Sequence, residues 1–140
     1  MSKIKTPDER VKYGSATPVI PLALRFKGKL YVLINGGTFS AASLLAANLQ
    51  GMGRAVVIGE ESGGGRNYLT GGLITEAVAP NSRLILRFGN IGMETPILEK
   101  TEGRGVMPDH EVSYSIKEYL SGVDKELEWA KSEIALRSKK

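Results

Sequence analysis

The chain has 140 residues, 41% hydrophobic and 24% charged, a balance that suits one globular domain. It contains no cysteine, which excludes disulfides, thiolate catalysis and thiolate metal sites. The net charge is +4, but the basic residues are spread along the chain, and no apolar run approaches the roughly 18 residues of a membrane span, so we expect neither a nucleic-acid partner nor a membrane-spanning helix.

The first part of the chain predicts a polar segment followed by strands. Residues 1–17 are polar and interrupted by proline and glycine, so we expect a surface lead-in, one domain portion over residues 18–137 and a basic tail over 138–140. Two apolar runs, Val19–Phe26 and Leu30–Asn35, flank a turn-like K-G-K and predict neighbouring strands.

The next segment predicts an α/β unit. Apolar residues at three- and four-residue spacing indicate a helix over Phe39–Met52 that is apolar on most of its surface and hence buried. The short β-branched run Ala55–Ile58 predicts an interior parallel strand. In such a βαβ unit the loops after the two strands, Gly36–Ser40 and Gly59–Gly65, meet at one edge of the sheet, where ligands gather.

The rest of the chain predicts two more strands and a helical end. The runs Leu73–Val78 and Leu84–Phe88 flank the turn A-P-N-S, and residues 89–110 have a composition typical of irregular structure. Residues 115–136 predict one or two amphipathic helices, with Asp124 as a cap of the last one.

Ser40 is the candidate nucleophile, because it lies where a strand leads into a helix. The first N–H groups of a helix have no intrahelical partner, so the N–H of Ala41 is placed to stabilise an oxyanion, while Gly36 and Gly37 let the backbone approach a substrate. The alternative is that Thr38 or Ser40 only caps the helix.

The second glycine-rich loop, G-E-E-S-G-G-G-R, does not follow the phosphate-binding pattern, since no Gly-Lys-Ser/Thr completes it. We interpret Gly63, Gly64 and Gly65 as turn residues beside a cleft. The single histidine, His110, fits a surface or half-buried position better than a catalytic base, and one histidine without cysteine predicts no metal site.

Four blocks in this order, G-G-T-F-S-A-A-S-L-L-A-A, G-R-A-V-V-I-G-E-E-S-G-G-G, P-N-S-R-L-I-L and G-R-G-V-M-P-D-H-E-V, resemble the C-terminal part of the S41 serine peptidases, the tail-specific or C-terminal processing proteases. The resemblance implies a ClpP- or crotonase-like α/β fold, a polypeptide substrate and no cofactor. It matches Ser40 to the family nucleophile and Ala41 to an oxyanion-hole position.

The chain also departs from that family. Members with a Ser-Lys dyad have a lysine where this chain has Gly65, and Arg66 cannot replace it because a guanidinium stays protonated. Members of the tricorn-like branch take their base from a histidine upstream. The segment D-L-R-x-N-x-G-G is missing too, so we expect a C-terminal portion of a larger peptidase, exported to the cell envelope or periplasm, whose base lies outside this chain.

Two consequences and two alternatives follow. We expect the chain alone to be inactive and to self-associate through the apolar surface that half a domain leaves exposed. The main alternative is a degenerate, non-cleaving peptide-binding module, which the missing lysine favours. A crotonase-type acyl-CoA enzyme is a further alternative, but it leaves the serine at the helix start unexplained.

Overall fold

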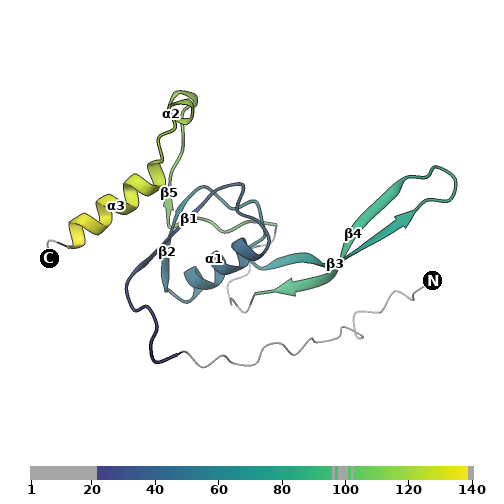
Figure 1. Ribbon diagram of the computed structural model, residues 1–140, viewed down its shortest axis with the longest axis horizontal. Coiled ribbons are helices and arrows are strands. Elements are labelled where there is room, and N and C mark those ends of the chain that lie inside the picture. Colours follow the sequence, from purple (N-terminus) through teal and green to yellow (C-terminus); the bar gives the residue numbers. More distant parts are fainter. Residues whose placement is uncertain (1–21, 96, 98–100, 102, 139–140) are drawn as a thin grey trace.

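The structure, a computed structural model, describes residues 22–95, 97, 101 and 103–138. In chain order the elements are β1 (Leu30–Ile34), α1 (Ala41–Gly51), β2 (Ala55–Gly59), β3 (Tyr68–Val78), β4 (Ile85–Glu94), β5 (His110–Glu111), α2 (Ile116–Ser121) and α3 (Lys125–Arg137) (Figure 1). The expected lead-in over residues 1–17 and the last two residues of the basic tail lie outside the described residues. None of the described helices is long and apolar enough to cross a membrane.

The centre of the fold is the predicted βαβ unit. Strands β1, β2 and β5 form a parallel sheet in that order, and Val32 lies opposite Val57 in the register of β1 and β2. Helix α1 connects β1 to β2. A separate antiparallel pair, β3 and β4, completes a mixed α/β architecture, so the predicted fold class is confirmed.

The sheet has a small apolar core on each face, because neighbouring strand residues point to opposite sides. Val57 and Ile34 pack with Ala46 and Ala47 of α1. Ile58, the next residue of β2, packs on the other side with residues of the C-terminal segment, including Ala130 of α3. The two faces are therefore covered by different helices. Helix α1 follows β1 after a short turn that ends at Ser40.

Helix α1 buries one face only. Ser43, Ala46 and Ala47 are buried, at the spacing of a single helical stripe, whereas the side chain of Leu45 is 61% exposed. The prediction of a helix buried on most of its surface is wrong for this outer face, because among the described residues α1 packs against the sheet on one side alone.

The antiparallel hairpin is longer than the sequence predicted. Residues 89–94, expected to be irregular, continue strand β4, and the hairpin projects away from the parallel sheet (Figure 1). The turn-type residues that suggested irregularity have a different cause. A Cβ atom on Gly92 would lie 2.4 Å from Tyr68 Oη, and one on Gly89 would lie 3.0 Å from the Gly71 nitrogen. These glycines allow close approach inside the hairpin.

The expected strand over Val19–Phe26 is also wrong in its described part. Residues 22–26 form no strand, and residues 19–21 lie outside the described residues. Within the described part of the chain, β1 pairs only with β2, so residues 22–26 have no neighbouring strand to pair with.

The C-terminal segment forms two helices, as predicted. Ser115 and Glu118 make a reciprocal capping box at the start of α2, and Gly122, with φ 71°, ends it. The predicted cap of α3 is confirmed, since Leu127 N–H donates to Asp124 Oδ1 at 2.8 Å.

Candidate active site

A tight turn carries the chain from β1 to Ser40. The Thr38 N–H donates to the Asn35 carbonyl at 2.8 Å, and the Asn35 N–H donates to Thr38 Oγ1 at 3.1 Å. Gly37 N–H donates to Asn35 Oδ1 at 2.9 Å. Backbone and side chains thus close the turn reciprocally, which fixes the direction in which α1 begins.

Ser40 has a strained backbone at the start of α1. Its φ is 51° and its ψ is −122°, a combination that costs a non-glycine residue about 1–3 kcal/mol. Its hydroxyl makes no hydrogen bond to any described residue, and the residue is exposed. The Thr38 hydroxyl accepts from Asn35 rather than from the helix. The capping alternative is therefore wrong for both residues.

The first turn of α1 leaves a donor beside Ser40. Ala42 N–H donates to the Phe39 carbonyl and Leu44 N–H to the Ser40 carbonyl, each at 3.1 Å. The N–H of Ala41 donates to no acceptor among the described residues. Because this end of the helix also carries the positive end of the helix dipole, an oxyanion next to Ser40 would be stabilised.

The second glycine-rich loop packs directly against this turn, as the sequence predicted. The Thr38 carbonyl accepts from Gly64 N–H at 3.0 Å and from the buried Ser43 hydroxyl at 2.9 Å. A Cβ atom on Gly63 would lie 2.2 Å from the Gly36 carbonyl oxygen. The glycines are thus required by close contact between two backbones, a more specific reason than turn geometry.

Gly65, which the resemblance matches to the lysine of the Ser-Lys members, has no room for a side chain. A Cβ atom there would lie 2.3 Å from the Tyr68 carbonyl oxygen. The neighbouring Arg66 is buried and points to the far end of α1, where its guanidinium donates to Gln50 Oε1 at 2.7 Å. The described chain around the second loop brings neither residue 65 nor residue 66 to Ser40 as a base.

Sequence reasoning missed the contacts that hold the second loop in place. The carboxylate of Glu61 accepts from Arg104 at 2.9 and 2.7 Å and from Gly105 N–H at 2.8 Å. The Arg104 hydrogen bond, followed by that from Gly105, lowers the pKa of Glu61. The buried Ser62 hydroxyl donates to the Gly64 carbonyl and accepts from Val106 N–H at 2.7 Å. The opposite charges in G-E-E-S and G-R-G-V were the only sequence signal of this pairing.

Asp109 and His110, around β5, make contacts with β2 and α3. The Asp109 carboxylate accepts from Val57 N–H at 2.8 Å, which ties the segment before β5 to β2. His110 is half-buried and stacks on Trp129 of α3, with ring centroids 4.2 Å apart. Among the described residues, no group of three histidines or carboxylates could hold a metal ion.

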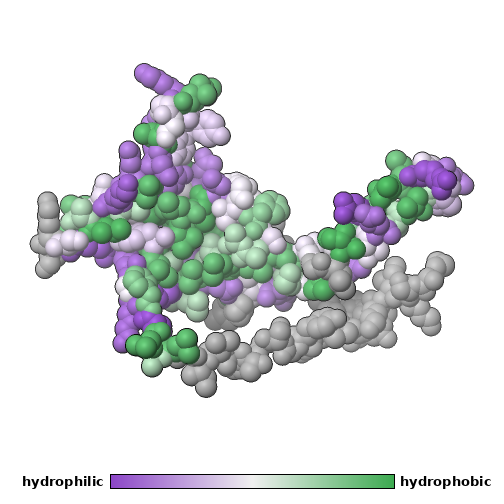
Figure 2. Space-filling view, in the orientation of Figure 1, coloured by the Kyte–Doolittle hydropathy of each residue, from purple (hydrophilic) through white to green (hydrophobic). Residues whose placement is uncertain are grey.

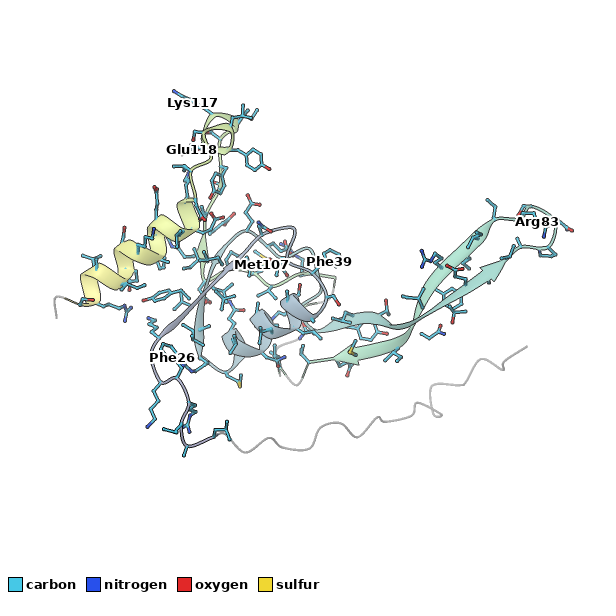
Figure 3. All side chains as sticks on the ribbon, viewed as in Figure 1. Phe26, Phe39, Arg83, Met107, Lys117 and Glu118 are labelled. Carbon is cyan, nitrogen blue, oxygen red and sulfur yellow. The ribbon has the colours of Figure 1, made fainter. Side chains whose placement is uncertain are left out.

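The described surface has two grooves near the two glycine-rich loops. One, of about 680 Å³, is lined by Asn35 and Thr38 of the turn and by residues of the α2 segment. The other, of about 660 Å³, lies beyond the second loop and includes Gly63, Gly65 and Arg104. Figure 3 shows Phe39, which comes just before Ser40, beside α1. The first groove therefore adjoins the turn before Ser40 and the second adjoins the second loop, and both have a size that small ligands occupy.

Comparison with known proteins gives one family. The sequence model of peptidase family S41 matches residues 2–112. No curated protein sequence matches the chain. The crystal structure of mature CPAF is similar over 64% of this chain, at 22% sequence identity and a TM-score of 0.42, and this chain covers 16% of the CPAF chain. Since the family match extends over more than half of the residues, the chain belongs to peptidase family S41.

Proposed function

We propose that this chain supplies the nucleophile and one oxyanion donor of a serine endopeptidase, Ser40 and the N–H of Ala41. The observation that carries the proposal is the strained backbone of Ser40, whose hydroxyl is free of any cap, next to a helix N–H without a described acceptor. Strained residues of this kind gather at active sites. Membership of family S41 supports peptide-bond hydrolysis as the reaction and a polypeptide as the substrate.

In the proposed mechanism Ser40 Oγ attacks the peptide carbonyl carbon while a base accepts the hydroxyl proton. The carbonyl oxygen becomes an oxyanion and accepts from Ala41 N–H. The base then protonates the leaving amine, and water hydrolyses the acyl-enzyme. The Ser40 hydroxyl has no partner in the described part of the chain, and Gly65 stands where the resemblance places the family lysine. We propose that the base comes from residues outside this chain.

The test compares two serines in the complete gene product that contains this chain. Ser40→Ala should reduce hydrolysis of fluorescent casein by at least about a thousandfold, whereas Ser132→Ala, on an exposed part of α3, should leave it unchanged. The 140-residue chain alone should show little or no hydrolysis. Casein hydrolysis that survives Ser40→Ala in the complete protein would overturn the proposal.

A second candidate, a peptide-binding module without cleavage, is favoured by one observation. The position of the family lysine is Gly65, and the Tyr68 carbonyl occupies the space of its side chain. This candidate requires that the complete gene product binds peptides, hydrolyses none of them, and binds them equally well after Ser40→Ala.

From the family resemblance we also propose that the parent protein works in the cell envelope or periplasm. A separate proposal is that the isolated chain self-associates. Phe39, Leu45 and Leu86 are exposed, and Figure 2 shows apolar side chains over the centre of the molecule and along the hairpin. Such surface is typical of an interface. Sedimentation of the chain at micromolar concentration should show particles larger than a monomer, and a monodisperse monomer would contradict the self-association.

A further inference from the structure

From the groove of about 680 Å³ that adjoins the turn before Ser40 we infer a substrate subsite that takes a large apolar side chain next to a basic residue. This inference rests on the proposed function, since it assigns the substrate of the same site. It goes beyond a general polypeptide substrate by naming the side chains that the groove recognises and the residues that recognise them.

The first argument is position. The groove is lined by Asn35 and Thr38, the two residues whose reciprocal hydrogen bonds close the turn before Ser40. An extended chain advances about 3.3 Å per residue, so a peptide with its scissile carbonyl at Ser40 reaches Thr38 within about two residues. The groove is thus continuous with the proposed catalytic turn rather than remote from it.

The second argument is the apolar wall. Ile116, Tyr119 and Leu120 lie at i, i+3 and i+4 of α2, which places them on one face of the helix, and all three line the groove. Their exposed fractions are 80%, 75% and 78%. Figure 2 shows hydrophobic side chains next to hydrophilic ones on the α2 segment at the top of the molecule. A leucine or phenylalanine of a substrate would bury this surface.

The apolar wall faces a second apolar residue from the sheet. Leu33 of β1 is partly exposed and lines the same groove as the α2 residues. Helix α2 is held by its capping box, and Glu118 also pairs with Lys125 at 2.9 Å. Figure 3 shows Lys117 and Glu118 on this helix. A subsite built on a capped helix and a strand is preorganised, which favours selection among side chains.

The third argument is charge. The described lining contains three carboxylates, Glu60, Asp124 and Glu126, and no lysine or arginine, although the chain as a whole carries a charge of +4. Glu126 is buried and accepts from the Tyr114 hydroxyl, and Asp124 caps α3, but Glu60 is exposed at the end of β2. A cationic residue beside the apolar one therefore complements the groove, whereas an acidic one is repelled.

The experiment measures peptide binding by the complete gene product carrying Ser40→Ala, so that no peptide is consumed. The probe is a dansylated hexapeptide of glycines with one leucine followed by one lysine. Leu120→Asp and Ile116→Asp should each weaken binding by about tenfold, because each places a charge where the leucine side chain would be buried. Leu136→Asp, an exposed leucine of α3 outside the groove, is the matched control and should leave binding unchanged.

Changes in the peptide test the same assignment. Replacing the leucine of the peptide by glycine should weaken binding to the Ser40→Ala protein and matter less once Leu120→Asp is added, because that variant has already lost the apolar contact. Replacing the lysine by glutamate should weaken binding to both, since the carboxylates of the groove remain. Equal binding by Leu120→Asp and Leu136→Asp overturns the inference. It is also overturned if Leu120→Asp leaves peptide binding intact and instead lowers the sedimentation coefficient, since the groove would then bind a second copy of the chain.

Hydrolysis separates this inference from the proposed function. If casein hydrolysis depends on Ser40 but kcat/KM for the leucine peptide is the same in Leu120→Asp and Leu136→Asp, only the subsite is wrong. If the gene product hydrolyses nothing yet Leu120→Asp still weakens binding, only the catalytic proposal is wrong.

Discussion

The Cα atom of Gly64 faces the hydroxyl of Ser43, so that a Cβ atom on Gly64 would lie 2.3 Å from Ser43 Oγ. Both residues donate to one acceptor, the Thr38 carbonyl. This shared carbonyl joins the second loop, the first turn of α1 and the turn before Ser40. The geometry of the proposed nucleophile thus depends on a glycine that lies 24 residues later in the chain.

We expect Gly64→Ala to destabilise the fold by about 1–3 kcal/mol, the usual cost of inserting atoms into a packed site. The new methyl group would push Ser43 away and break its bond to Thr38. Urea unfolding measures the change. Gly36→Ala is the control, because no described atom lies within 4 Å of its Cβ position, and it should change the stability by less than about 0.5 kcal/mol. Equal losses in both variants would contradict the packing argument.

Gly65→Lys should not restore a Ser-Lys dyad. The lysine Cβ would collide with the Tyr68 carbonyl oxygen, so the backbone would have to move before the amine could approach Ser40. We expect a lower thermal unfolding midpoint and no gain in casein hydrolysis by the complete gene product. Increased hydrolysis at unchanged stability would show that the loop can adopt the geometry of the lysine-containing members.

Acid should loosen the second loop through Glu61. The pKa of Glu61 is lowered from its usual 4.5, first by the Arg104 hydrogen bond and then by that from Gly105. A carboxyl group with a lowered pKa in the folded state stabilises the fold above its unfolded value and loses that contribution as pH falls through the folded value. The urea concentration at the unfolding midpoint should therefore decrease as the pH is lowered below about 4.5 in the unsubstituted protein. It should decrease less steeply in Glu61→Gln.

The control for this pH dependence is Glu128→Gln. The Glu128 carboxylate is exposed and makes no hydrogen bond to a described residue, so its substitution should leave the acid slope as it is. Glu118 also contributes to the slope, between about pH 4.5 and pH 2, since hydrogen bonds from the Ser115 backbone, then its hydroxyl, and then Lys125 lower its pKa to about 2. Equal slopes in the parent and Glu61→Gln would show that the Arg104 contact does not support the fold.

The cap of α3 should be worth about 1 kcal/mol. Asp124→Ala removes the acceptor of Leu127 N–H and leaves that donor without its partner, which typically costs about 0.5–2 kcal/mol. Asp124→Asn keeps an acceptor and should recover most of the loss. Because α3 covers one face of the sheet, hydrogen exchange at Ala130 reports the same change. A full loss in Asp124→Asn would point to charge rather than capping.

The features that the sequence predicted depend on residues close together in the chain, and the features that it missed depend on residues far apart. The helix after Ser40, the parallel strands around it and the Asp124 cap depend on neighbouring residues, and local patterns predicted them. The extent of β4 did not follow from composition, because Gly89 and Gly92 look like turn residues until the opposite strand is known. The exposed outer face of α1 was likewise invisible, since periodicity does not tell how many sides of a helix are covered.

The candidate site shows the same division. Ser40 and Ala41 were identified from a strand-to-helix pattern and a family resemblance, whereas their catalytic roles remain proposals. The strain at Ser40 could not be predicted, because it depends on packing against a loop 24 residues later. The contacts of Glu61 with Arg104 and of Ser62 with Val106 could not be predicted either, because they join residues 43 and 44 positions apart. No local pattern encodes a partner at that distance.

The Glu61–Arg104 contact, which spans 43 residues, also orders events during synthesis. Chains leave the ribosome from the N-terminus at about 5–20 residues per second, so residues 104–106 follow Ser40 by several seconds. Until they emerge, the second loop lacks its contacts from Arg104, Gly105 and Val106, and the unfavourable φ of Ser40 can relax. The backbone geometry proposed for the nucleophile is therefore completed only after residues 104–106 have been synthesised.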